Sequence, residues 1–371
     1  MAADGFRYTF AGVKGKDSSA RGRGAVSNRT GRFESLTVEE FDDGWQRENE
    51  ERASPRTHVF ADTARTIINT NDSPDVPFDR SINPYRGCEH GCIYCFARPT
   101  HAYLGLSPGL DFETQIYAKH DAADLLRRQL SAKSYKPRTI VLGANTDPYQ
   151  PVEGRLELTR SVVSVLSEFS HPVAMITKSA LVLRDLDLLG PMAARGLAQV
   201  SVSVTTLDAD MARTMEPRAS TPTRRLEAIR RLSEAGVPVA VLTAPMIPGL
   251  TDWEMDRILE AAREAGAVTA GYVLLRLPLE IADLFTEWLE EHHPARARRV
   301  LDLMRQAREG KLYRSEWGTR MHGTGPYADM LARRFDAACA RLGFSDRGFK
   351  LDSTAFRVPL PATAQLALFD P

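Results

Sequence analysis

The sequence predicts an α/β protein built on a partial (β/α)6 barrel of the TIM type, with an irregular N-terminal arm and a helical C-terminal cap. Between residue 81 and about residue 276, five short apolar runs alternate with amphipathic helical segments, and residues 81–85 add a first strand, which makes six. Strands that alternate with helices form parallel β-α units with right-handed crossovers. The chain has 371 residues, of which 43% are hydrophobic, so it can build one barrel-sized domain with extensions.

Residues 1–60 are predicted to form the arm. They are polar and rich in Gly and Arg at first, and residues 38–51 are acidic. Such a composition buries too little apolar surface to fold alone, so we expect a flexible, irregular segment that partly wraps on the body. The RGRG run at 21–24 has two interpretations, a solvated stretch or a contact to a phosphate backbone.

Residues 61–277 are predicted to form the barrel. The functional residues of a parallel barrel lie where strands end and loops begin. A barrel that stops at six strands also leaves a lateral opening, wide enough for a macromolecular substrate. We expect the strands at residues 81–85, 139–143, 173–177, 199–204, 237–242 and 271–277, with helices including 159–169, 223–236 and 252–266.

After residue 278 the strand patterns stop. Helical patterns follow at residues 279–291, 295–309 and 327–342, and they predict a cap over residues 278–358. Residues 359–371 form a proline-flanked tail that is too short to fold alone.

The charge and the cysteine content restrict the possible partners of the chain and its cellular compartment. The 48 basic residues balance 48 acidic ones, so a nucleic-acid contact has to come from local patches. We find no signal-peptide core and no run long enough to span a bilayer, and we expect a cytoplasmic chain without membrane contact. In a reducing compartment, clustered cysteines indicate metal binding or redox chemistry.

Three of the four cysteines, Cys88, Cys92 and Cys95, have the spacing C-x3-C-x2-C, and Cys339 lies far along the chain. Four thiolates close a tetrahedral site, whereas three thiolates on a [4Fe–4S] cluster leave one iron open to a reactant. The alternative is a zinc site completed by His90 or Cys339. The loop follows the first predicted strand, where a barrel places its active site.

With Tyr94 at the aromatic position, the loop resembles the signature of the radical S-adenosylmethionine (SAM) superfamily, C-x3-C-x-aromatic-C. The resemblance covers about residues 81–276. It implies that the open iron chelates the amino and carboxylate groups of SAM. It also implies that one electron, from a donor such as flavodoxin or ferredoxin, splits SAM to a 5′-deoxyadenosyl radical.

The same resemblance implies SAM contacts at the strand ends. The polar groups there suit the amino group, the carboxylate and the ribose, and the loop after the fifth strand and the sixth strand suit the adenine. For each of these residues taken alone, the competing interpretation is a polar side chain that only forms a hydrogen bond at the end of a strand. The expected contacts are Tyr94, Asn145, Thr146, Asp147, Lys178, Ser179, Ser201, Ser203, Pro248 and Leu275.

Within the superfamily the chain is most similar to the branch of spore photoproduct lyase and the proteins called DNA repair photolyases. The shared motifs are CEHGCIYCF, TDPYQP, ITKS and MEPRAS. The lyase carries a hydrogen-donating cysteine at the end of its second strand, where this chain has Ala144. Tyr149, Tyr272 and Cys339 are the alternative hydrogen donors, with packing as the competing interpretation of each.

The tail ends in a pentapeptide that resembles the bacterial sliding-clamp-binding motif, Gln-Leu-Ser/Asp-Leu-Phe. A flexible peptide can place a Leu-Phe pair in an apolar pocket while its Gln bonds at the rim. The alternative is a tail that folds back on its own domain. Tethering to a clamp raises the local concentration of DNA without requiring a basic protein. The matching residues are Gln365, Leu366, Leu368 and Phe369.

Together these features predict a radical SAM enzyme, a lyase or a modifying enzyme, that acts on nucleic acid in DNA repair or modification. DNA is favoured over RNA as the substrate. Two alternatives stay open. One is a radical SAM enzyme that modifies RNA or protein, and the other is a non-catalytic metal-cluster protein that the sliding clamp recruits to DNA.

Overall fold

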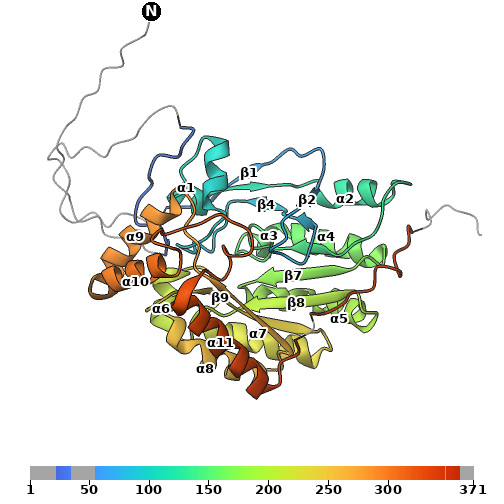
Figure 1. Cartoon of the computed structure of the whole chain (residues 1–371). Coiled ribbons are helices and arrows are strands. Elements are labelled where there is room, and N and C mark those ends of the chain that lie inside the picture. Colours follow the sequence, from blue (N-terminus) through green and yellow to red (C-terminus); the bar gives the residue numbers. More distant parts are fainter. Residues whose placement is uncertain (1–21, 35–54, 347, 360–371) are drawn as a thin grey trace, which may run out of the picture.

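The computed structural model describes residues 22–34, 55–346 and 348–359. Its centre is a seven-stranded sheet with the order β10-β9-β8-β7-β6-β3-β2 (Figure 1). Six of the strands are parallel and neighbour one another in chain order, so the predicted partial barrel is confirmed. The parallel strands are β3 (Arg80–Ile82), β6 (Ile140–Leu142), β7 (Val173–Thr177), β8 (Ala198–Ser203), β9 (Val239–Met246) and β10 (Thr269–Leu274).

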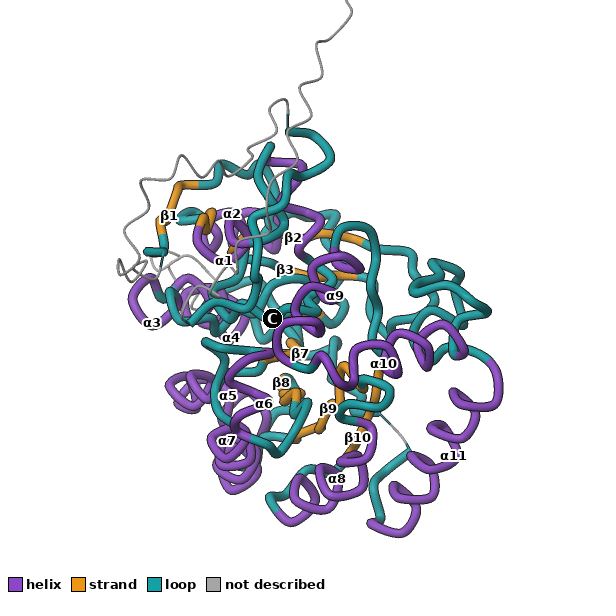
Figure 2. Tube along the Cα trace, turned by 90° about the vertical axis from the view of Figure 1, so that its left-hand side faces the viewer, coloured by secondary structure: helices purple, strands orange, loops and turns teal. Residues whose placement is uncertain are grey.

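The sheet is open between β10 and the antiparallel edge strand β2 (Ile68–Thr70). The helices that follow the strands cover its outer face and enclose the main apolar core (Figure 2). The longer ones are α2 (Ala122–Leu130), α4 (Leu158–Glu168), α5 (Leu186–Ala194), α7 (Pro222–Glu234) and α8 (Met255–Glu264). The chain also contains the shorter helices η1 (Arg98–Leu104), α1 (Leu110–Thr114), α3 (Glu153–Leu156), η2 (Ala180–Asp185), α6 (Ala209–Met215) and η3 (Asp252–Glu254).

Local sequence explains why these helices form and face inward. In α8 the residues Met255, Ile258, Leu259 and Ala262 recur at helical spacing, and all four are buried. At the start of α7, the Thr221 hydroxyl accepts a hydrogen bond from the Arg224 amide and proline occupies the first turn. The apolar stripes noted in the sequence are therefore the faces that pack against the sheet.

A second, three-stranded sheet was not predicted. It contains β1 (His58–Ala61), β5 (Gln115–Ala118) and β4 (Tyr85–Arg86). The predicted first strand, residues 81–85, is wrong in detail, because β3 ends at Ile82 and Tyr85 belongs to β4. Pro84 lacks the amide hydrogen that a continued ladder needs. The cysteine loop therefore leaves the small sheet rather than a barrel strand.

The C-terminal region contains α9 (Ile281–His292), α10 (Pro294–Gln306) and α11 (Gly325–Leu342), at the places where the sequence shows helical patterns. Helix α9 buries Trp288 in an apolar cluster that also contains Ile93 and Tyr94 of the cysteine loop. Helix α11 lies against α8 (Figure 1). Within the described residues, no helix is long and apolar enough to cross a membrane.

Candidate active site

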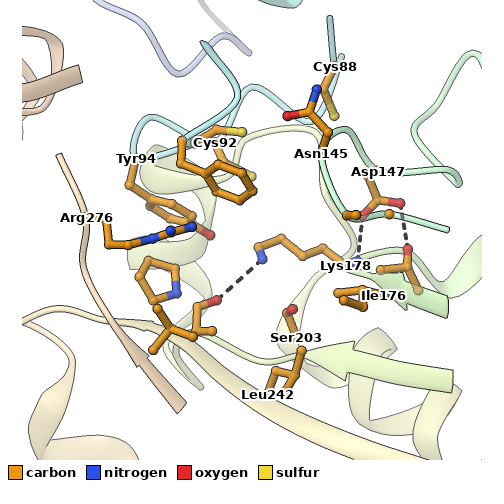
Figure 3. Close-up of a pocket in the computed structure, with 18 of the residues that line it drawn as sticks. Cys88, Cys92, Tyr94, Asn145, Asp147, Ile176, Lys178, Ser203, Leu242 and Arg276 are labelled. Atoms are coloured by element: carbon orange, nitrogen blue, oxygen red, sulfur yellow. Dashed lines mark hydrogen bonds between the residues drawn. The ribbon is translucent and has the colours of Figure 1, made fainter. Parts of the chain in front are cut away.

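A cavity of about 250 Å³ lies at the carboxyl ends of the barrel strands, next to the cysteine loop (Figure 3). It brings together residues from the cysteine loop and from the ends of β6 to β10. Eight residues that the sequence marked for the cluster or for SAM line it: Cys88, Cys92, Tyr94, Cys95, Asn145, Asp147, Lys178 and Ser203.

The cysteine loop is held by backbone hydrogen bonds. The amide of Cys88 donates to the Phe112 carbonyl (2.9 Å), and the amide of Ile93 donates to the Met215 carbonyl (3.1 Å). The buried Arg98 guanidinium donates to the carbonyls of Gly91 (3.0 Å) and Cys92 (2.9 Å). All four cysteines of the chain are free thiols, so the thiols of the loop are not consumed in a disulfide.

These thiols fit an iron–sulfur cluster better than a single metal ion. Burial raises the pKa of Cys88 and Cys92, so both side chains favour the protonated thiol. Each thiol would release its proton when it binds iron. In the described part of the chain, no three His, Cys, Asp or Glu side chains converge on a point that could hold one ion. A zinc tetrahedron needs such convergence, whereas a [4Fe–4S] cluster takes each thiolate on a different iron.

The two residues proposed to complete a zinc site are engaged elsewhere. His90 is buried, and its Nδ1 lies 3.4 Å from the Asp147 carboxylate. Cys339 lies on α11 in the main apolar core, away from the cavity. Both positions argue against the zinc alternative.

Asp147 joins three parts of the site. Its carboxylate accepts hydrogen bonds from the Lys178 amide (2.7 Å), the Thr177 hydroxyl (2.7 Å) and the Tyr149 amide (2.9 Å). Burial would raise the pKa of Asp147, but nearby His90 and these hydrogen bonds outweigh burial and hold it at about 2. The anionic side chain thus ties the loop after β6 to the end of β7 and to the cysteine loop.

Lys178 extends into the cavity from the end of β7 (Figure 3). Its Nζ lies 3.4 Å from the Ala244 carbonyl oxygen and 5.8 Å from the centre of the Tyr94 ring. Burial lowers the pKa of Lys178, and among the described residues no carboxylate pairs with its ammonium group. The site therefore presents a cation that can pair with the carboxylate of a bound ligand.

Five of the expected SAM contacts do not line the cavity. The Thr146 hydroxyl donates to the Tyr85 carbonyl (2.9 Å), and the Ser179 hydroxyl caps η2 by accepting from the Leu181 amide (3.2 Å). Ser201 lies on β8 two residues before Ser203, farther from the strand end. The remaining two are Pro248, in the loop after β9, and Leu275, buried in the cluster under α9.

The apolar wall of the cavity comes from β7, β9 and β10 instead. Pro245 lines the cavity where the sequence indicated Pro248, and the last residues of β10 line it where Leu275 was expected. For Leu275 the error is one residue, and because a β-strand alternates its two faces, such an error exchanges the inside for the outside. The apolar wall residues are Ile176, Leu242, Ala244, Pro245, Val273 and Leu274.

None of the three alternative hydrogen donors reaches the cavity. Tyr149 is fully buried, and its hydroxyl donates to Asp185 (3.0 Å). Tyr272 packs against His322 and Phe335, and Cys339 lies in the core. A hydrogen donor must touch the reacting atoms, and none of these three residues lines the cavity. Ala144 does line the cavity.

Sequence reasoning missed several residues of the site. Phe96 follows the third cysteine and is 43% exposed, and the Arg276 guanidinium lies 4.5 Å from the centre of its ring. Glu216 accepts hydrogen bonds from the Tyr94 hydroxyl and from the buried Arg225, and so fixes Tyr94 in the wall. The MEPRAS motif contained Glu216, but only the fold shows what it contacts.

Comparisons with known proteins agree with this geometry. The model of the radical SAM superfamily matches residues 82–262. A curated protein of Mycobacterium tuberculosis is 38% identical over 233 residues, which are 62% of this chain and 68% of the relative. One of Methanocaldococcus jannaschii is 25% identical over 232 residues, 62% of this chain and 82% of the relative.

The fold is similar to solved structures of spore photoproduct lyase. One variant aligns with a TM-score of 0.55 at 17% identity, over 77% of this chain and 80% of the lyase. Another, with bound SAM and a dinucleoside spore photoproduct, aligns with a TM-score of 0.54 at 18% identity over the same shares.

Proposed function

The chain belongs to the radical SAM superfamily, whose cofactors are a [4Fe–4S] cluster and SAM, and we propose that this enzyme acts on nucleic acid. The substrate class that we favour is DNA, and the reaction is a repair or a modification of one base. The reducing cytoplasm is the compartment that suits such a cluster.

The residues of the cavity divide between the two cofactors. Cys88, Cys92 and Cys95 would hold the cluster, with Lys178 and Asn145 placed for the carboxylate and amino group of SAM. When bound, the cluster supplies the electron that splits SAM to a 5′-deoxyadenosyl radical. The apolar wall of β9 and β10 keeps water away from that position.

The observation that supports a nucleic-acid substrate is the pair formed by Phe96 and Arg276. Both residues line the cavity, and the guanidinium stacks over the partly exposed ring. No carboxylate or carbonyl within the described residues hydrogen-bonds or ion-pairs with Arg276. A free guanidinium beside an aromatic face suits a nucleotide, because it can hold a phosphate while a base stacks on the ring.

Two further points support the proposal. One structure of spore photoproduct lyase, which shares the fold, contains a dinucleoside photoproduct. The sheet does not close between β10 and β2, which is compatible with a large substrate, although a duplex base must be flipped to enter the cavity. Ala144 distinguishes the chain from the lyase, so we propose a reaction that does not end with hydrogen transfer from a thiol at that position.

We expect Arg276→Ala to weaken the binding of a single-stranded DNA oligonucleotide about tenfold or more, the value of a hydrogen bond to a charged group. Fluorescence anisotropy on the anaerobic, SAM-loaded holoenzyme measures this. Arg257→Ala is the matched control, because Arg257 stacks on Trp253 outside the cavity.

Equal loss in both variants, or no change in Arg276→Ala, would contradict the proposed role. Matched DNA, RNA and peptide substrates, assayed for stimulation of 5′-deoxyadenosine release, distinguish the proposal from a radical SAM enzyme of RNA or protein. A protein that binds DNA but never cleaves SAM would instead be the non-catalytic metal-cluster protein.

We also propose that the tail tethers the enzyme to a bacterial sliding clamp. Gln365, Leu366, Leu368 and Phe369 lie outside the described residues, so the proposal rests on the motif alone. An enzyme that is tethered to a clamp on DNA needs no strong positive potential of its own to reach the DNA. This suits the balanced net charge of the chain.

A peptide ending in AQLALFDP should bind the clamp in competition with a polymerase clamp peptide. Affinity should be modest, because an extended peptide loses conformational freedom on docking. Replacing Leu368 and Phe369 by Ala should eliminate binding, while Thr363→Ala should retain it. If wild-type protein does not bind the clamp and the double variant loses its cluster, the Leu-Phe pair packs on its own domain and stabilises it.

A further inference from the structure

The loop between α10 and α11 exposes a tryptophan beside the cavity. Trp317 is 58% exposed, and its ring stacks on no aromatic or cationic side chain among the described residues. An exposed indole offers a flat face on which an aromatic group of a ligand can stack.

This loop is fixed to the rim of the cavity. The Gly318 amide donates to the Asp75 carboxylate (2.7 Å), and the Arg320 guanidinium bonds to Asp75 and to the Ser73 hydroxyl (2.6 Å). On the other side, the Leu274 amide at the end of β10 donates to the Met321 carbonyl (2.8 Å). Trp317 therefore lies on a loop that is fixed on two sides and that lines the cavity through Met321.

The charges around the loop favour an anionic partner. Glu309 and Glu316 both pair with Arg314, and Asp75 pairs with Arg320. Two further cations on or next to the loop, Arg276 and Lys311, have no acidic partner within ion-pair distance among the described residues. A third, Arg308, is buried and donates to the carbonyls of Leu274, Leu275 and Arg320, so it is not available to a partner.

We propose that the loop of residues 309–324 is a docking site for single-stranded nucleic acid, with Trp317 stacking on a base next to the one that enters the cavity. This inference rests on the proposed function and extends it. A protein partner would need a contiguous apolar patch, whereas the residues that flank Trp317 in the sequence, Ser315, Glu316, Gly318 and Thr319, are polar or small. A rigid, isolated aromatic ring among cations is how proteins hold single strands without sequence preference.

The test compares three tryptophan variants of the full-length holoenzyme. Trp317→Ala should weaken binding of a short, labelled single-stranded oligodeoxynucleotide by about 5- to 150-fold, the measured range for stacking on one aromatic residue. Trp317→Phe should recover most of the affinity, because a phenyl ring still stacks. Trp253→Ala is the matched control, since Trp253 is 52% exposed but lies on η3, outside the loop of residues 309–324.

An oligonucleotide of the same length without bases separates stacking from charge. Wild type and Trp317→Ala should bind it equally. Lys311→Ala should weaken the binding of both the normal oligonucleotide and the one without bases, and should reduce the salt dependence of that binding. Equal binding of the normal strand by wild type and Trp317→Ala overturns the inference and leaves the proposed function standing. If wild-type holoenzyme binds no oligonucleotide, the inference and the nucleic-acid substrate both fall.

Discussion

Replacing Cys88, Cys92 or Cys95 by Ala should abolish reductive cleavage of SAM in anaerobically reconstituted protein. Each thiol faces the same cavity, and a cluster held by two thiolates exposes a second iron to water and to loss. We expect the iron and sulfide content to fall with the activity. The measurement is 5′-deoxyadenosine released after addition of dithionite, together with cluster absorbance.

Cys339→Ala is the matched control. Its thiol is buried on α11 in the main apolar core, where alanine removes one small group and costs only modest stability. The variant should keep its cluster and its SAM cleavage. Cleavage that survives in any of the three loop variants, or is lost in Cys339→Ala, would contradict the assignment of the cluster ligands.

The barrel could be predicted because its signals are local. Each strand is a short apolar run, and α8 displays its buried face as a regular stripe within a few turns. The predicted bounds of the first strand were wrong because of one local feature, Pro84. Proline ends the hydrogen-bonded ladder there, and the next residues join the small sheet. That sheet was missed because its strands have two to four residues each.

The site was predictable only in part, because the cysteine spacing is local but the SAM contacts are not. Lys178 directly follows β7 and Asp147 lies in the loop after β6, and both line the cavity. Arg276 lies on the chain far from Phe96, and no sequence pattern relates the two. The same holds for Glu216 and Tyr94, whose contact depends on how α6 packs against the cysteine loop.

The contacts of the N-terminal arm could not be predicted from the sequence either. Residues 22–34 lie against the cysteine loop, and a Cβ at Gly24 would overlap the Gly91 carbonyl. Arg23 of the RGRG run is buried, and its guanidinium donates to the Glu113 carbonyl (2.9 Å) and the Thr57 hydroxyl (3.1 Å). It is therefore not free to contact phosphate, and the interpretation of this arginine as a nucleic-acid contact is wrong.

Glu113 is the residue that joins the arm to the site. Its carboxylate is fully buried and accepts hydrogen bonds from the amides of Gly24 (2.9 Å) and Ala25 (2.8 Å). It also pairs with Arg98 (2.5 Å), whose guanidinium holds the carbonyls of Gly91 and Cys92. One side chain thus ties residues 22–34, α1 and the cysteine loop together.

Glu113→Ala should therefore lower the free energy of unfolding by about 3–5 kcal/mol, the usual cost of leaving one partner of a buried ion pair uncompensated. The amides of Gly24 and Ala25 lose their acceptors, so their hydrogen exchange should speed up. Chemical denaturation and hydrogen exchange measure the two effects. Glu168→Ala, which breaks the exposed pair with Arg127, should cost about 0–1 kcal/mol.

The cluster gives a second readout of the same contact. Without Glu113, the Arg98 guanidinium loses the anion that balances it beside the Cys92 carbonyl, so the cysteine loop should hold the cluster less firmly. We expect Glu113→Ala to lose iron to a chelator faster than wild type, and Glu168→Ala to match wild type. Faster hydrogen exchange at Gly24 with unchanged iron loss would mean that Glu113 fixes the arm alone. Unchanged stability would show that the buried pair contributes nothing to the fold, contrary to its full burial.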